Sequence, residues 1–154
     1  MTDATREDLH FEDVVPGTRF VTPSHTVTDA AIAAFAEVTL DHSSLHLDDD
    51  LARSMGFPRR IAHGLYGLAL MEGLKSRLRL YDHTSIASLG WDRVRFRAPI
   101  LSGDTVRVRF AFASKRETGK PDRGVVIETA TLEREDGTVL IEAEHATLLR
   151  RRGF

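Results

Sequence analysis

The sequence predicts an α+β fold in which a curved antiparallel sheet wraps around one central buried helix. Apolar residues recur at helical spacing up to about residue 80, and from residue 85 onward they alternate as they do in strands. The second observation is a strongly apolar helical segment over residues 64–78, which has too little polar surface for a solvent-facing helix. Such a helix needs a cover, and a strongly curved antiparallel sheet can provide it.

The first half of the chain contains one predicted strand and three predicted helices. Residues 19–27 are rich in β-prone side chains and form the strand. Thr28 is placed to cap a helix over residues 29–38, and a short helix over residues 49–55 follows a polar loop. The buried helix comes last, with apolar positions at Leu65, Leu68, Ala69, Met71, Leu74 and Leu78.

The second half consists of long predicted strands separated by turns. In the strand that begins near Asp104, Val106 and Val108 point to one face while Arg107 and Arg109 point to the other. Successive strands joined by short turns predict an antiparallel meander. The strands expected are residues 85–96, 104–114, 124–133 and 139–149.

Length and composition restrict the class of protein. The chain has 154 residues, so we expect a single domain over residues 1–154, with its core at about 11–149. It has no cysteine, which excludes disulfides, thiolate metal sites and a cysteine nucleophile. The net charge of −2 gives no reason to expect nucleic-acid binding. The apolar stretch 65–74 is too short to span a membrane, and residues 1–13 lack a signal-peptide core.

These features predict a soluble, unexported, cytoplasmic protein. The one basic run, Arg150 to Arg152, is interpreted as a solvated tail.

Asp41 and His46 are the first candidates for chemistry. They lie in the polar loop over residues 40–50, where a carboxylate and an imidazole can converge on one water molecule. Histidine can act as acid or base near neutral pH, so the two side chains together form a potential general acid–base pair. On spacing alone, both residues are also compatible with an ordinary polar turn.

Gly64 is the second candidate, because it opens the buried helix. The first amides of a helix lack internal partners and lie at the positive end of its dipole, so one of them can hold a carbonyl oxygen that becomes negative. A plain helix-capping role is the alternative. The neighbouring His63 is compatible with a ligand, a substrate contact or a structural histidine.

The segment Leu40 to Gly64 resembles the hydratase signature of the MaoC-like dehydratases, which include the (R)-specific enoyl-CoA hydratases. The usual form of the signature is G-D-x-N-P-x-H-x-D followed by F-x3-I-A/V-H-G. Residues 95–105 resemble the family's later R-F-x-x-P-x-x-x-G-D-T segment, so the resemblance covers roughly residues 11–149. This chain departs from the signature in three places, with Leu40 for Gly and Ser43 and Ser44 for Asn and Pro.

The resemblance implies a hotdog fold, a homodimer or higher homo-oligomer, and a role in fatty acid metabolism. The implied substrate is an acyl thioester of coenzyme A or acyl carrier protein, and no metal or other cofactor is expected. Asp41 and His46 match the catalytic pair, and Gly64 matches the amide that holds the thioester carbonyl. The expected reaction is the addition of water to an enoyl thioester, or its removal. Substrate-binding candidates are Ser43, Ser44, Phe57, Arg59, Arg60, His63 and Leu65.

Three other functions remain open at this stage. A hotdog thioesterase would direct water at the thioester carbon instead of the β-carbon. A zinc site is conceivable because His42 and His46 have H-x3-H spacing with Asp41 and His63 nearby. A non-catalytic module that binds acyl thioesters is the third alternative.

Overall fold

The structure is a computed structural model that describes residues 8–154. After a short 3-10 turn at Phe11–Asp13, the elements follow in the order β1 (Arg19–Val21), β2 (His25–Thr26), α1 (Asp29–Thr39), α2 (Ser44–Leu47), α3 (Asp49–Ser54), α4 (Gly64–Ser76), β3 (Ser85–Phe96), β4 (Thr105–Glu117), β5 (Arg123–Arg134) and β6 (Val139–Arg150). The expected α+β order is therefore confirmed. Within residues 8–154, every helix is too short or too polar to cross a membrane.

The sheet is antiparallel, with strand order β1-β4-β5-β6-β3, and β2 also pairs with β4. The predicted meander holds for β4, β5 and β6, but it is wrong for β3. This strand pairs with β6, because residues 97–104 cross from one side of the sheet to the other. Backbone hydrogen bonds from Arg97 to Leu140 and from Gly103 to Val27 hold the crossing in place. The alternation of apolar residues specifies a strand but not its neighbour.

The predicted strand over residues 19–27 is divided into β1 and β2. Pro23 lies between them and lacks the amide proton that a continuous ladder would use. Thr22 maintains the pairing next to the break, because its amide donates to the Val108 carbonyl and its hydroxyl accepts from the Val108 amide, both at 3.0 Å.

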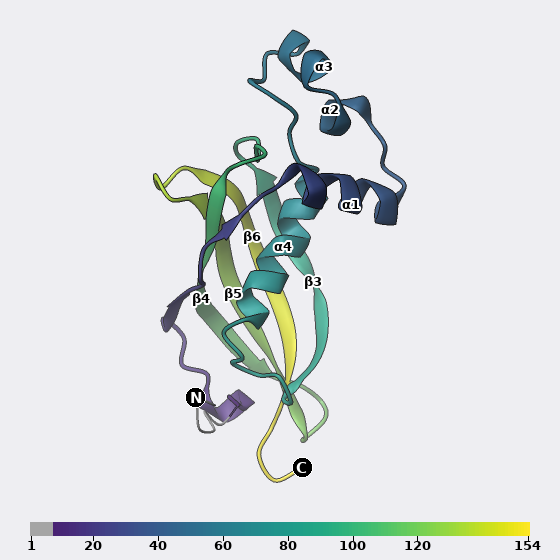
Figure 1. Cartoon of the computed structure of the whole chain (residues 1–154). Coiled ribbons are helices and arrows are strands. Elements are labelled where there is room, and N and C mark those ends of the chain that lie inside the picture. The colour runs from purple at the N-terminus through teal and green to yellow at the C-terminus, as the bar shows by residue number, and fades with distance from the viewer. Residues whose placement is uncertain (1–7) are drawn as a thin grey trace, which may run out of the picture.

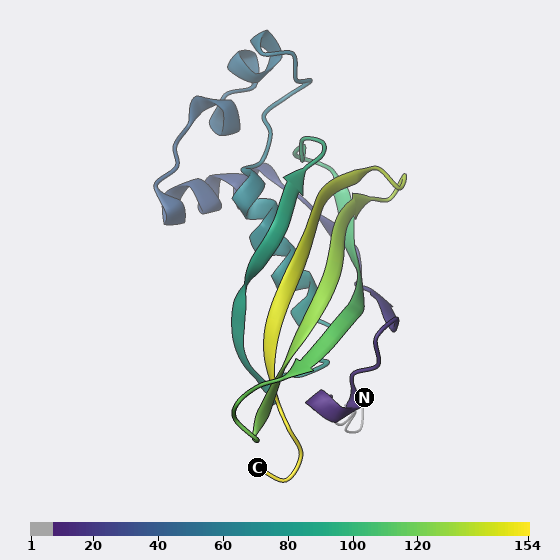
Figure 2. The ribbon, with the colours of Figure 1, turned by 180° about the vertical axis from the view of Figure 1, so that it is seen from behind.

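Helix α4 lies across the concave face of the sheet, which curves around it (Figures 1 and 2). Met71 and Leu74 are buried against strand residues such as Val108 and Leu132. Gly67 permits the close approach, because a Cβ atom there would lie 2.4 Å from Ile100 Cδ1 and 2.6 Å from Ile141 Cδ1. The central helix and the curved sheet are thus as expected from the sequence.

The prediction that α4 is buried nearly all the way round is wrong for the isolated chain. Leu65 is 65% exposed, and Ala69 and Gly73, one and two turns further on, are exposed as well. Only the face of α4 toward the sheet is covered, since the concave side of one sheet can enclose only part of a helix.

Helices α1, α2 and α3 form an arm beyond one end of the sheet, beside the start of α4 (Figure 1). The Thr28 hydroxyl caps α1 by accepting from the Ala31 amide at 3.1 Å, as expected. Helix α2 is an addition to the prediction, because it forms inside the segment interpreted as a polar loop. Its single turn has too little apolar periodicity to be recognised from sequence.

The basic C-terminal run is not a solvated tail. Arg151 pairs with Glu12 at 2.8 Å and Arg152 pairs with Asp13 at 2.7 Å. The two ends of the described chain lie at the same end of the molecule, which brings these opposite charges together (Figure 1). The hydrogen bonds from Arg151 and Arg152 lower the pKa values of Glu12 and Asp13, respectively.

Candidate functional site

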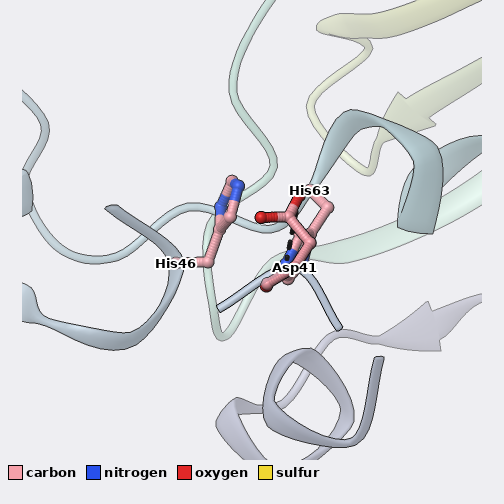
Figure 3. A group of neighbouring side chains, drawn as sticks. All are labelled: Asp41, His46 and His63. Carbon is pink, nitrogen blue, oxygen red and sulfur yellow. Dashed lines mark hydrogen bonds and ion pairs between the residues drawn. The ribbon is translucent and has the colours of Figure 1, made fainter. Parts of the chain in front are cut away.

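Three polar side chains from separate segments meet beside the start of α4 (Figure 3). Asp41 follows α1, His46 lies in α2, and His63 directly precedes α4. One oxygen or nitrogen atom from each lies within 4.8 Å of the others. We call these three residues the Asp41 cluster. The fold therefore brings Asp41 and His46 together, in agreement with the hypothesis that they form a pair.

The hydrogen bonding of His46 leaves one ring nitrogen available. Its Nδ1 atom lies 2.7 Å from the carbonyl oxygen of Ile61. Because a carbonyl only accepts, Nδ1 carries the proton in this bond, and Nε2 of the neutral ring has a lone pair. His46 is half-buried and lines a cavity. Its Nε2 atom is thus suited to accept a proton from a bound water.

Asp41 presents a carboxylate that is 53% exposed. Its Oδ1 atom accepts from the Ser43 amide at 3.3 Å, and Oδ2 lies 4.0 Å from Nε2 of His63. Leu40, just before it, has a φ angle of 62°, the left-handed conformation that glycine adopts without strain. This is where the hydratase signature has glycine, the residue that adopts such a conformation most readily.

An apolar cavity of about 470 Å³ opens beside His46. Gly64, the first residue of α4, contributes to its wall. A Cβ atom at Gly64 would lie 2.7 Å from the Phe96 ring, so glycine allows this ring to close over the helix start. The remaining wall is formed by Phe57, Ile61, Ala62, Leu65, Phe96, Arg97, Ala98, Pro99, Ile100 and Ile141. The cavity therefore joins a potential base, a helix-start amide and an apolar surface.

The structure places the substrate-binding candidates in different environments. Phe57 and Leu65 line the cavity, whereas Ser43 and Ser44 are exposed and outside its lining. The carbonyls of these two serines accept from the amides of His46 and Asp48, so their backbones shape α2.

The two candidate arginines also differ. Arg60 binds Asp49 through its backbone amide and its Nε atom, at 2.9 and 3.0 Å. The side-chain bond raises the pKa of Arg60. Its guanidinium is therefore already engaged with α3. Arg59 is exposed, and its guanidinium lies beside Gly103.

His63 is buried behind the cavity instead of lining it. It is 3% exposed, and its Nε2 atom donates to the backbone carbonyl of Asp41 at 2.9 Å. Its ring packs against that of His46, with centroids 3.8 Å apart and an angle of 32° between the planes. This placement favours a structural part for His63 among the alternatives left open by the sequence.

Several cavity residues were absent from the sequence-based candidates. Phe96 and Pro99 belong to the segment that resembles R-F-x-x-P, so that motif could have identified them. Ile141 has no such signal, because it reaches the cavity only through the pairing of β6 with β3.

His42 does not belong to the Asp41 cluster. Its Nε2 atom is 2.9 Å from Oε1 of Glu37 on the exposed side of α1. The H-x3-H pattern that suggested zinc therefore does not bring its two histidines into one group. The remaining candidates for a cation are the three side chains of the Asp41 cluster.

Comparison with known proteins supports one family. The family model "MaoC like domain" matches residues 12–133. The chain is 34% identical over 114 residues to Protein MaoC of Klebsiella aerogenes, which covers 74% of this chain but only 33% of that protein's length. It is 28% identical over 149 residues to an (R)-specific enoyl-CoA hydratase of Rhodospirillum rubrum, covering 94% of each.

Solved structures agree with the fold. The crystal structure of a MaoC-like dehydratase from Rhodospirillum rubrum matches with a TM-score of 0.81 and 26% identity, covering 95% of this chain and 99% of that one. A Mycobacterium tuberculosis protein with a double hotdog fold matches with a TM-score of 0.82 and 22% identity, covering 95% of this chain and 45% of that one. The fold of residues 8–154 is accordingly a hotdog fold.

Proposed function

This chain belongs to the MaoC-like domain family, and from that premise we propose that it is a hydro-lyase acting on acyl thioesters. It adds water to an enoyl thioester or removes water from a 3-hydroxyacyl thioester. The single observation that carries this proposal is that His46 lies beside Asp41 and lines an apolar cavity together with Gly64, while the bond to Ile61 occupies only its Nδ1 atom. Asp41 itself lies outside the lining of this cavity.

In the proposed hydration, the amide of Gly64 donates a hydrogen bond to the thioester carbonyl oxygen. This stabilises the negative charge that develops there when water attacks the β-carbon, and one such donor contributes about 2.7–4 kcal/mol to lowering the barrier. Gly64 suits this part because it begins α4 and has no Cβ atom to obstruct the carbonyl.

Asp41 and His46 hold the reacting water between them. The water oxygen bonds to the β-carbon while its proton passes to Nε2 of His46, and the π-electron pair of the double bond shifts to the α-carbon. The protonated His46 then returns this proton to the α-carbon, which leaves the ring neutral again. The sum is the addition of one hydrogen and one hydroxyl group across the double bond, and dehydration follows the same path in reverse. These steps move only protons and water, so they require neither a metal ion nor a redox cofactor.

The substrate we propose is an acyl thioester of coenzyme A or of acyl carrier protein. The apolar wall formed by residues such as Phe57, Leu65 and Phe96 suits an acyl chain. An (R)-specific enoyl-CoA hydratase is among the relatives, which supports the same class. We also propose that the protein forms a homodimer and takes part in fatty acid metabolism in the cytoplasm.

The test is a hydration assay with crotonyl-CoA and longer enoyl-CoA thioesters. Asp41→Asn and His46→Ala should each lower kcat by about 10²–10⁴-fold, the usual contribution of general acid–base catalysis, with an unchanged circular dichroism spectrum. His42→Ala is the matched control, because this neighbouring histidine lies outside the Asp41 cluster, and it should retain full activity.

The same assay separates the alternatives. Loss of the enoyl absorbance without release of free thiol supports hydration, whereas thiol release identifies a thioesterase. Tight binding of the thioester without either change would identify a non-catalytic binding module. Near-wild-type hydration by both the Asp41→Asn and His46→Ala variants would refute the assignment.

A further inference from the structure

His63 contacts every part of the proposed machinery without lining the cavity. Its side chain donates to the Asp41 carbonyl and packs against the His46 ring, and its backbone leads directly into Gly64. Asp41 lies after α1 and His46 lies in α2, so neither is attached to α4 by sequence. His63 is the one side chain of the Asp41 cluster that belongs to the α4 segment.

The hydrogen bond to Asp41 fixes the state of the His63 ring. Because the carbonyl only accepts, Nε2 carries the proton and Nδ1 has the lone pair. This Nδ1 atom is buried and has no hydrogen-bond partner among the described residues.

Two other rings pack against the His63 ring. The His46 centroid lies 3.8 Å away and that of Phe35 in α1 lies 5.1 Å away. Movement of the His63 ring would therefore disturb the plane of the His46 ring, whose Nε2 atom must point at the water. The His63 side chain makes no capping hydrogen bond to α4, so its replacement removes no helix cap.

We propose that His63 is a positioning residue for the hydration reaction. It holds the Asp41 backbone through its Nε2–H group and the His46 ring through stacking, so that both act at a fixed place relative to the Gly64 amide. This inference rests on the proposed function. It assigns to His63 neither a proton transfer nor a contact with the substrate.

Two substitutions separate the two contacts. His63→Phe keeps a buried ring against His46 but removes the donor to Asp41, whereas His63→Gln keeps a donor but removes the ring. A misplacement of about 1 Å can lower turnover by about 10²-fold. We expect His63→Phe to lower kcat by about 10–100-fold with little change in KM, and His63→Gln to recover part of that loss. His42→Ala is the control for both.

A second measurement does not depend on turnover. The imidazole ¹⁵N resonances of His46 report whether Nδ1 carries the proton and how firmly the ring is held. His63→Phe and His63→Gln should both shift these resonances in the protein without substrate, while His42→Ala should leave them unchanged. Thermal unfolding of each variant shows whether a lower kcat reflects loss of folded protein.

The outcomes are distinct. Lower kcat together with shifted His46 resonances in a folded protein supports the positioning role. A raised KM with unchanged kcat would indicate that His63 contacts the substrate. Unchanged kcat with unchanged resonances would indicate that His63 does not position His46 or Asp41. Either result overturns the proposal. If the wild-type protein hydrates no enoyl thioester, the proposed function fails, and the resonances alone decide whether His63 positions His46.

Discussion

The two ends of α4 each meet a polar cluster that contains histidine, and the clusters differ in whether their groups are already paired. At the start of α4, the Asp41 cluster borders a cavity, and His46 keeps one ring nitrogen open. Near the other end, Lys75 enters a second group, formed by Glu72, Lys75, Tyr81, Glu128 and His145, which we call the Lys75 cluster.

The buried members of the Lys75 cluster are paired with one another or with a neighbouring side chain. The Lys75 ammonium contacts Glu128, Glu72 at 3.3 Å and Nδ1 of His145 at 3.1 Å, while Tyr81 donates to Glu128. Both ring nitrogens of His145 have partners, since Nε2 lies 2.7 Å from the Ser88 hydroxyl. Lys75, Glu128 and His145 are all at most 5% exposed.

The difference shows which polar cluster is suited to chemistry. Buried groups such as Lys75, Glu128 and His145, whose polar atoms are paired with neighbouring side chains, serve to fix the structure. A base must instead keep a lone pair for the substrate or water, as His46 does. We therefore expect the Lys75 cluster to govern stability and the Asp41 cluster to govern turnover.

The largest effect expected from this comparison is that of Lys75→Met. The substitution removes the ammonium that balances the buried Glu128 carboxylate and leaves it only Tyr81 and His145 as partners, which should lower the free energy of unfolding by about 3–5 kcal/mol. Urea unfolding measures this loss, and the hydration kcat of the folded fraction should stay near the wild-type value. The double variant Lys75→Met with Glu128→Leu should be more stable than Lys75→Met alone. A loss of under about 1 kcal/mol in the single variant would contradict the structural role.

The next largest expected effect is on the loss of folding stability at low pH. Burial by itself would raise the pKa of Glu128, but the close contact with His145, the charge of Lys75 and the hydroxyl of Tyr81 outweigh it and lower that pKa. A carboxylate whose pKa is lowered by folding stabilises the protein above its unfolded pKa, near 4.5, and this contribution is lost as pH falls through the folded value. Thermal unfolding from pH 7 to pH 3 should show a smaller loss for Glu128→Gln than for the wild type. Equal slopes would argue against the lowered pKa.

The smallest expected effect comes from two glycine substitutions, one toward each end of α4, where the packing differs. In Gly67→Ala, the new Cβ would meet Ile100 and Ile141 at 2.4 and 2.6 Å. Overpacking costs about 1–3 kcal/mol, which outweighs or offsets the gain of about 1 kcal/mol in helix propensity. In Gly73→Ala the new Cβ meets nothing within 4 Å, so the same gain should appear as a net stabilisation. Denaturant midpoints compare the pair, and equal shifts would contradict the close packing at Gly67.

The sequence predicted those parts of the candidate site that short sequence patterns indicate. Residue type and the start of a helix made Asp41, His46 and Gly64 candidates, and the resemblance to the MaoC-like dehydratase signature implied their roles. The substrate-binding candidates Ser43, Ser44 and Arg60 lie close to them in sequence, yet the structure places the serines outside the cavity and pairs Arg60 with Asp49. Closeness along the chain did not determine which side chains face the cavity.

The sequence by itself determined the helix over residues 29–38, the central apolar helix and the four long strands, because the periods of 3.6 and 2 residues are local properties. Only the tertiary structure decided that β3 pairs with β6, that Phe96 and Ile141 wall the cavity, and that Lys75 meets Glu128. Each of these depends on contacts between residues far apart in the chain. A repeating pattern shows which face of an element is buried, but the partner on that face is chosen by the packing of the whole molecule.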